Sequence, residues 1–146
     1  MNLREKQDQF ISDMAMFETW PDRFNYLISL SDQLPPKCPE NLLKHKIEFC
    51  QSQTFFKAVC PTSPQSPNPL QISGWSNSPI IGGIIIAIAT IFNLAEYEEL
   101  ETTEINFHTR SRLIENLTPI RQQSLLEMIR RIKGNLRPAS TIPIFQ

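Results

Sequence analysis

The fold of this chain is decided by the stretch SPIIGGIIIAIATIF, residues 78–92. Ser78 is a favourable N-cap, and Pro79 suits the first position of a helix, where its missing N–H is not needed. The apolar run is shorter than the roughly 20 residues that a membrane-spanning helix needs, and Glu96 follows soon after it. We therefore predict a central helix over residues 79–94, buried on most sides inside the protein, and no membrane partner.

Further helices are predicted on both sides of this segment from apolar spacing and capping residues. Residues 2–15 carry apolar side chains three and four positions apart, and Thr19 followed by Pro21 marks the start of a second helix. Thr118 and Pro119 repeat this cap-and-proline signal before the last helix. The predicted helices cover residues 2–15, 20–34, about 98–102, about 107–113 and 119–136.

A small sheet is predicted between the second helix and the central one. From Cys50 to Val59 the residues alternate with a period of two, and Thr, Phe and Val suit a half-buried strand. Four prolines within residues 61–69 predict a loop, and Leu70 to Gly74 form a second strand antiparallel to the first. The predicted fold class is α+β, with helices packed on one face of a small antiparallel sheet.

The composition suits one globular domain. The length of 146 residues is typical of a single domain. Fourteen Lys and Arg against 15 Asp and Glu give a net charge of −1, without the basic excess that nucleic-acid-binding proteins usually show. The N-terminus lacks the apolar region of a signal peptide, and the cysteine count of three is odd. We expect a reducing, cytoplasmic location, no disulfide framework and no nucleic-acid partner.

Cys50 is the first candidate for chemistry, because it lies where a polar loop passes into the predicted strand. A loop thiol near positive charge, here Lys44 and Lys46, can act as a nucleophile once it is deprotonated. The alternative is a small buried apolar residue, as many cysteines are. We interpret Cys60 as a structural thiol and Cys38 as an exposed loop residue without a partner. An extended strand excludes a Cys50–Cys60 disulfide, because ten residues span about 30 Å.

Other site types receive little support. The sequence has no CxxC pair, no GxGxxG motif and no P-loop, so metal and nucleotide sites are not indicated. Cys50 with His45 or His108 would form the nucleophile and base of a thiol hydrolase, but no orienting Asn or Asp is identifiable. Basic residues at the end of the last helix match its dipole, and we interpret them as solvated surface, with partner docking as the alternative. These residues are Arg130, Arg131, Lys133 and Arg137.

Several motifs occur in an order that is typical of one family. CQSQ stands at residues 50–53, GWSNSPIIGGI at residues 74–84 and NLTPIRQQSLLEMI at residues 116–129. In this order and separation they resemble the SufE-like sulfur-acceptor proteins of iron–sulfur cluster assembly, over about residues 10–136. Either the cysteine motif or the LTPIR motif alone would be a weak signal, whereas both together are specific.

The resemblance implies a fold and an organisation. The expected fold is a curved antiparallel sheet of about three strands flanked by helices, within the α+β class. The expected organisation is a single SufE-like domain over residues 1–137 and a C-terminal tail over residues 138–146. We expect either a monomer or a homodimer.

The resemblance also implies roles for individual residues. Cys50 falls on the family's reactive cysteine, which takes sulfane sulfur from the persulfide of a cysteine desulfurase, stimulates that enzyme and passes sulfur to a cluster scaffold complex. Arg121 falls on an arginine implicated in docking to the desulfurase. No cofactor of its own is implied, because the pyridoxal phosphate belongs to the desulfurase. The remaining partner-binding positions are Gln51, Ser52, Gly74 and Asn77, the last two on a loop near the cysteine loop.

One departure from the family pattern lies beside the cysteine. Phe49 stands where the family usually has glycine, so it either stiffens the loop or covers the thiol. Two other functions stay open. An iron–sulfur scaffold needs about three or more cysteine ligands close together, so Cys38 and Cys60 would have to approach Cys50. A thiol hydrolase is the third interpretation.

Overall fold

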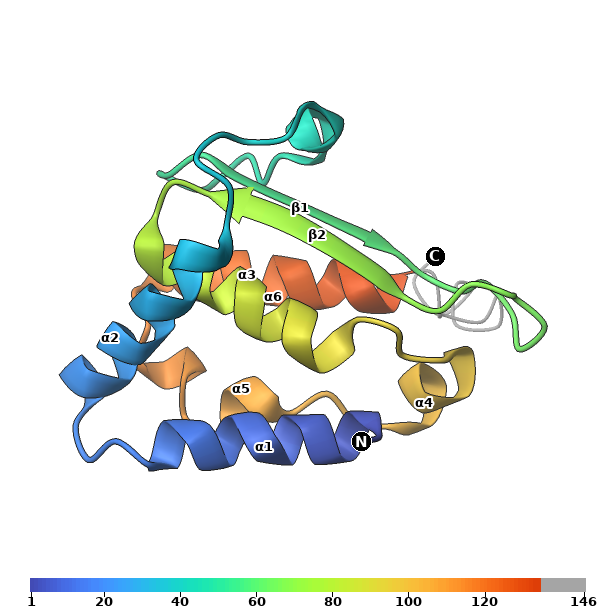
Figure 1. Cartoon of the computed structure of the whole chain (residues 1–146), viewed down its shortest axis with the longest axis horizontal. Coiled ribbons are helices and arrows are strands. Elements are labelled where there is room, and N and C mark those ends of the chain that lie inside the picture. The colour runs from blue at the N-terminus through green and yellow to red at the C-terminus, as the bar shows by residue number, and fades with distance from the viewer. Residues whose placement is uncertain (135–146) are drawn as a thin grey trace, which may run out of the picture.

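The protein is built around a β-hairpin with helical structure on both of its faces (Figure 1). The computed structural model describes residues 1–134. The predicted helix end near residue 136 and the predicted tail over residues 138–146 lie outside the described residues. The elements in chain order are α1 (Leu3–Ala15), α2 (Trp20–Leu30), η1 (Ser31–Gln33), η2 (Glu40–His45), β1 (Thr54–Val59), β2 (Gln71–Ser76), α3 (Pro79–Phe92), α4 (Tyr97–Thr102), α5 (Phe107–Arg110), η3 (Ile114–Asn116) and α6 (Pro119–Lys133).

The hairpin confirms the α+β class but holds fewer strands than expected. Strands β1 and β2 pair antiparallel from Thr54 opposite Ser76 to Val59 opposite Gln71. Within residues 1–134 these are the two strands of the sheet, and the expected third strand is reduced to one bridge between Lys46 and Phe55. The residues before this bridge form the 3-10 helix η2, which packs over Phe55 and Trp75 and leaves too little extended chain for a strand.

Helix α3 is the centre of the main core, as its apolar sequence predicts. Ser78 caps it by accepting a hydrogen bond from the N–H of Ile81, and Ile84, Ile88 and Phe92 are fully buried. Gly83 lets α2 cross α3 at close range, because a Cβ atom at this position would lie 1.9 Å from the Leu27 carbonyl oxygen. Helix α1 packs below α3, next to α5 (Figure 1).

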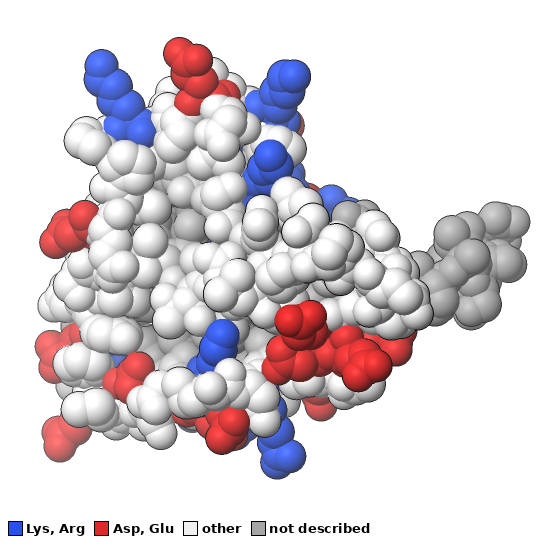
Figure 2. All heavy atoms as spheres, turned by 45° about the vertical axis from the view of Figure 1, so that its right-hand side comes forward, with Lys and Arg blue, Asp and Glu red and all other residues white. Residues whose placement is uncertain are grey.

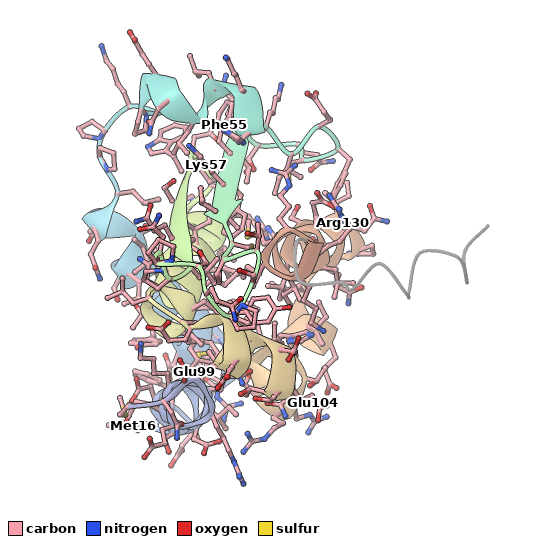
Figure 3. All side chains as sticks on the ribbon, turned by 90° about the vertical axis from the view of Figure 1, so that its right-hand side faces the viewer. Met16, Phe55, Lys57, Glu99, Glu104 and Arg130 are labelled. Atoms are coloured by element: carbon pink, nitrogen blue, oxygen red, sulfur yellow. The ribbon has the colours of Figure 1, made fainter. Side chains whose placement is uncertain are left out.

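The two faces of the hairpin cover two separate apolar clusters. Phe56 belongs to the main core, while Phe55 packs with Leu42 and Trp75 in a smaller cluster. Figure 3 shows Phe55 on the side of β1 that η2 covers. This division follows from the alternation of side chains along a strand. Cys38 is half-buried against the smaller cluster and its thiol donates to the Pro39 carbonyl, so the expectation of an exposed loop residue without a partner is wrong. Burial raises the pKa of the Cys38 thiol, which makes this cysteine a poor nucleophile.

The surface carries charges of both signs. On the face drawn in Figure 2, acidic and basic side chains are interspersed, and a cluster of acidic side chains lies at the lower right. This distribution agrees with the near-neutral net charge of −1. Among the described residues, no helix combines the length and the apolar character that crossing a membrane requires.

Candidate functional site: a cysteine in an open cleft

The cysteine motif forms a short loop between η2 and β1. The N–H of Ile47 donates to the carbonyl of Thr54 at 2.9 Å and closes the base of this loop. Inside it, the N–H of Cys50 donates to the Ile47 carbonyl at 3.3 Å. We call residues 48–53 the cysteine loop. Cys50 therefore does not lie in the strand, which begins only at Thr54.

A chain of hydroxyl groups supports this loop from beneath. Ser52 Oγ and Thr54 Oγ1 are 2.9 Å apart, and Thr54 Oγ1 lies 2.9 Å from Ser76 Oγ. Ser76 Oγ in turn accepts from the N–H of Ser78, the N-cap of α3. Thr54 and Ser76 are buried, so these bonds replace water that the hydroxyl groups would otherwise need. The loop is thereby tied to the start of the central helix.

A second tie joins the loop to the end of β2. The N–H of Gln53 donates to the side-chain oxygen of Asn77 at 3.0 Å, and the N–H of Asn77 donates to the Gln53 carbonyl at 3.1 Å. Asn77 is therefore next to the cysteine loop, as expected. Gly74 is not: it lies inside β2, where a Cβ atom would meet Ile85 of α3 at 2.8 Å. The expectation that Gly74 belongs to a loop is wrong, because β2 extends to Ser76.

Cys50 opens onto a cleft of about 620 Å³. The cysteine loop forms one wall, the start of α3 a second and the first turns of α6 a third. The lining residues are Cys50, Gln51, Ser52, Ser78, Ile81, Thr118, Pro119, Ile120, Arg121 and Ser124. The structure thus brings together four of the predicted site residues, Cys50, Gln51, Ser52 and Arg121, from two segments about 70 residues apart in the sequence.

The thiol of Cys50 has a polar partner on α6. Cys50 Sγ lies 2.7 Å from Ser124 Oγ, and the Ser124 hydroxyl donates to the Ile120 carbonyl at 3.0 Å. Only 1% of Ser124 is exposed to solvent. Sequence reasoning missed this residue. A sequence signal for Ser124 does exist. The helical pattern places this serine on the inward face of α6, with the buried Leu125 and Met128.

Arg121 brings an uncompensated positive charge to the cleft. Within residues 1–134 it has no hydrogen-bonded or ionic partner. It is also the one charged side chain among the described residues that line the cleft. A guanidinium group has five N–H donors and is well suited to bind carboxylates or backbone carbonyls of another molecule. Arg121 is thus available for a partner.

Phe49 leaves the thiol uncovered. Its side chain is 45% exposed and does not line the cleft. Of the two expectations for this residue, a cover over Cys50 is therefore wrong, and stiffening of the loop stays a prediction. An exposed aromatic side chain next to the thiol is instead an apolar contact that a partner could use.

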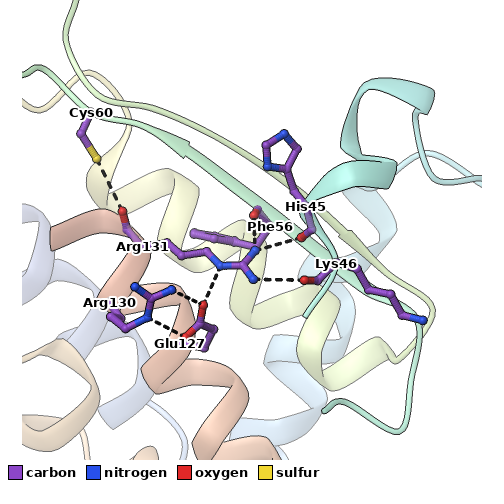
Figure 4. A network of polar contacts seen from close by, with 7 residues as sticks. All are labelled: His45, Lys46, Phe56, Cys60, Glu127, Arg130 and Arg131. Carbon is purple, nitrogen blue, oxygen red and sulfur yellow. Dashed lines mark hydrogen bonds and ion pairs between the residues drawn. The ribbon is translucent and has the colours of Figure 1, made fainter. Parts of the chain in front are cut away.

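The far end of α6 corrects another expectation. Arg131 is not solvated surface: it donates hydrogen bonds to the backbone carbonyls of His45, Lys46 and Phe56 (Figure 4). Its side chain is 23% exposed and also bonds Glu127 at 2.7 Å. This arginine joins α6 to η2 and β1, so it holds together the elements on which the cysteine loop stands. Arg130 pairs with Glu127 as well and is largely exposed.

Cys60 is a structural thiol, in agreement with the prediction. It is 7% exposed, and its Sγ–H donates to the Ile132 carbonyl at 3.0 Å. It therefore faces the last turns of α6, whereas Cys50 faces the first turns. All three cysteines lie within the described residues, and none of them forms a disulfide.

The histidines lie away from the cleft. His108 is buried, and burial together with Lys133 lowers its pKa, while His45 is held by its carbonyl to Arg131. Neither histidine lines the cleft of Cys50. Residues 1–134 hold no group of three or more His, Cys, Asp or Glu side chains placed to bind a metal ion.

Comparison with known proteins identifies relatives along almost the whole chain. An uncharacterized SufE-like protein of Rhizobium meliloti (strain 1021) is 31% identical over 130 residues, which cover 87% of this chain and 91% of the relative. The cysteine desulfuration protein SufE of Wigglesworthia glossinidia brevipalpis is 27% identical over 140 residues, 94% of each chain.

A solved structure and a family match complete this comparison. The solution structure of a hypothetical protein from Thermus thermophilus superposes with a TM-score of 0.60 at 17% identity, over 92% of this chain and 95% of that chain, which shows a shared fold. Residues 8–136 match the SufE family, described as an Fe-S metabolism associated domain. Because this match includes the cysteine loop, α3 and the cleft-forming turns of α6, the chain belongs to the SufE family.

Proposed function

We propose that this protein accepts sulfane sulfur on Cys50 from the persulfide of a pyridoxal-phosphate cysteine desulfurase and delivers it for iron–sulfur cluster assembly in the cytoplasm. The observation that carries the proposal is the position of Cys50, in an open cleft beside an arginine that has no partner within residues 1–134. Membership of a family associated with Fe-S metabolism supports it, and so does a relative named as a cysteine desulfuration protein.

The reaction is a thiol exchange without net redox change. The Cys50 thiolate attacks the outer sulfur of the desulfurase persulfide, and a new sulfur–sulfur bond forms at Cys50 Sγ. The sulfur–sulfur bond of the desulfurase breaks, and its electron pair leaves with the desulfurase thiolate. The products are a Cys50 persulfide and a reduced desulfurase cysteine, so neither a metal nor a cofactor on this chain takes part in the step.

A persulfide on Cys50 is protected from the protein's other thiols. A second thiol within reach would attack the persulfide and discharge it as a disulfide. Cys60 donates to the backbone of α6, and Cys38 packs in the cluster under η2. Cys50 thus contacts the first turns of α6, Cys60 contacts its last turns and Cys38 lies in the other cluster, so the sulfur is kept for transfer to another protein.

The partner surface surrounds the opening of the cleft. Arg121 supplies a positive charge, while Gln51 and Ser52 supply polar groups on the opposite wall. Asn77 stands behind the loop and fixes Gln53, so its contribution to binding is through the loop position. In this proposal the desulfurase retains the pyridoxal phosphate, its stimulation follows from removal of its persulfide, and a scaffold complex is the next acceptor.

The two alternative functions find less support in the site. A cluster scaffold would need ligands that the described residues do not gather at Cys50. A thiol hydrolase would need a histidine base within hydrogen-bond reach of the thiol, and the neighbour of Cys50 Sγ is instead the Ser124 hydroxyl.

The proposal is tested by intact-protein mass spectrometry after incubation with a cysteine desulfurase and cysteine. We expect the wild type to gain the mass of one or more sulfur atoms and Cys50→Ser to gain none, while both proteins show the same thermal unfolding. Cys60→Ser is the matched control and should gain sulfur like the wild type, because its thiol serves packing. Equal sulfur gain by Cys50→Ser would refute the proposal.

A further inference from the structure

We infer that Ser124 is a positioning residue that stabilises the reactive, deprotonated form of Cys50 by turning its hydroxyl toward the sulfur. The geometry that carries the inference is a chain of two contacts, from Cys50 Sγ to Ser124 Oγ at 2.7 Å and from Ser124 Oγ to the Ile120 carbonyl at 3.0 Å. The inference explains how the thiol of the proposed function is made ready, and it can be tested without a desulfurase.

The two contacts assign the protons in the resting state. The Ser124 hydroxyl has one hydrogen, and this hydrogen is donated to the Ile120 carbonyl. The Ser124 oxygen is therefore the acceptor toward Cys50, whose thiol donates. A thiol is a weak donor, so this arrangement holds the sulfur in place without strong stabilisation.

Loss of the thiol proton reverses the direction of this hydrogen bond. A thiolate is an acceptor only, so the Ser124 hydroxyl rotates about its Cβ–Oγ bond and donates to the sulfur. Ile120 and Ser124 both lie in α6, four positions apart, so the Ile120 carbonyl keeps the helical N–H of Ser124 as its partner. The rotation therefore exchanges a neutral bond for one to a charged acceptor, which is roughly twice as strong.

Within residues 1–134 the Ser124 hydroxyl is the hydrogen-bond partner of Cys50 Sγ. Ser124 is 1% exposed, so water does not compete with it from the helix side. The charged groups near Cys50 are Arg121 on α6, and Lys46 and Glu48 at the start of the loop, both exposed. Helix α3 contributes Ile81 and the capping residue Ser78 to the cleft but no charge. Arg121 is thus the charged residue of the cleft whose removal has to be compared with the removal of the Ser124 hydroxyl.

The test is the rate at which iodoacetamide alkylates Cys50, followed by peptide mass spectrometry across a range of pH. We expect Ser124→Ala to react about three- to tenfold more slowly than the wild type near neutral pH, since less thiolate is present. At alkaline pH, where Cys50 is a thiolate in both proteins, Ser124→Ala should react faster than the wild type, because a less stabilised thiolate is the stronger nucleophile. The two pH profiles therefore cross.

Three variants separate this role from packing. Ser124→Thr keeps the hydroxyl and should retain the wild-type profile if the added methyl group fits, which thermal unfolding will show. Thr90→Ala removes a hydroxyl that likewise donates to the carbonyl four residues earlier in a helix, at 2.8 Å from the Ile86 oxygen and outside the lining of the Cys50 cleft, and should change nothing. Arg121→Gln removes the charge alone and shows how much of the profile the arginine sets.

The outcomes distinguish this inference from the proposed function. Superimposed profiles of wild type and Ser124→Ala, or a variant that is slower by one factor at every pH, would overturn the role of Ser124. Sulfur acceptance by the wild type in the desulfurase assay is unaffected by that result. Crossed profiles in a wild type that takes up no sulfur would instead leave Ser124 as the partner of Cys50 and refute sulfur acceptance.

Discussion

Helix α6 meets the cysteine-bearing segment at both of its ends, and the two ends are built in opposite ways. At the first turns Arg121 has no partner within residues 1–134, and Ser124 contacts Cys50 in an open cleft. At the last turns Arg131 bonds three backbone carbonyls and Glu127, and Cys60 is buried against the helix backbone. Satisfied polar groups stabilise a fold, whereas an unsatisfied charge at a cleft is available for binding. One end serves stability, and in our proposal the other serves reactivity.

The largest effect expected from this difference is on the free energy of unfolding. Arg131→Ala leaves three backbone carbonyls without their guanidinium donor and removes one of the two arginines that bond Glu127, so we expect a loss of about 3 kcal/mol in urea unfolding. Arg121→Ala, on the same helix, should cost less than about 0.5 kcal/mol, because it breaks no bond within residues 1–134. Equal losses for the two arginines would contradict the comparison.

A smaller effect is expected when the pH is lowered. Hydrogen bonds from Arg130 and Arg131 lower the pKa of Glu127 from its ordinary value of 4.5 to about 2, although partial burial opposes them. A carboxyl group with a lowered pKa in the folded state stabilises the fold above its unfolded pKa, and this contribution disappears as the pH falls from about 5 to about 2. After allowance for solvent screening, we expect about 2 kcal/mol.

Glu127→Gln is the variant that isolates this contribution. It should be less stable than the wild type near neutral pH and approach wild-type stability as the pH falls, since the wild-type carboxylate is then protonated. Urea unfolding at a series of pH values measures both curves. Parallel curves down to acidic pH would show that Glu127 gains nothing from its two arginines.

The smallest effect concerns affinity for the desulfurase. We expect Arg121→Ala to weaken the complex about tenfold, or about 1.4 kcal/mol, as measured by titration calorimetry. Arg130→Ala is the matched control from the other end of α6, because Arg130 is exposed and its charge is already paired with Glu127. Weakening by Arg130→Ala and not by Arg121→Ala would place the docking surface at the wrong end of the helix.

The helices were predictable from the sequence because their signals are local. Thr19, Ser78 and Thr118 occupy the N-cap positions that their side chains and the following prolines predict. The number of strands was not predictable. The short η2 helix forms where a third strand was expected, and it forms because it packs over Phe55 and Trp75. Tertiary contacts of this kind override local preferences in strands.

The site was predictable in part. Residues that stand in a motif could be named from the sequence, whereas residues defined by a partner far away in the chain could not. Cys50 and Arg121 could be named because each stands in a motif, and the fold places both at one cleft. The roles of Ser124 and Arg131 could not be named, because their partners lie 74 to 86 residues away in the chain. A polar residue at an inward helix position and a basic residue at a helix end each have several explanations until the fold is known.

The closed base of the cysteine loop has a consequence for amide hydrogen exchange. The amides of Ile47 and Asn77 donate to backbone carbonyls and are held in place. Residues 48–51, in contrast, are joined to another element of the described chain by the hydrogen bond between Cys50 and Ser124. Amides at the base should therefore exchange slowly, with the stability of the hairpin, and those at the tip quickly. Because only residues 48–51 have to move, Cys50 can turn its sulfur outward while the base of the loop and the surrounding fold stay intact.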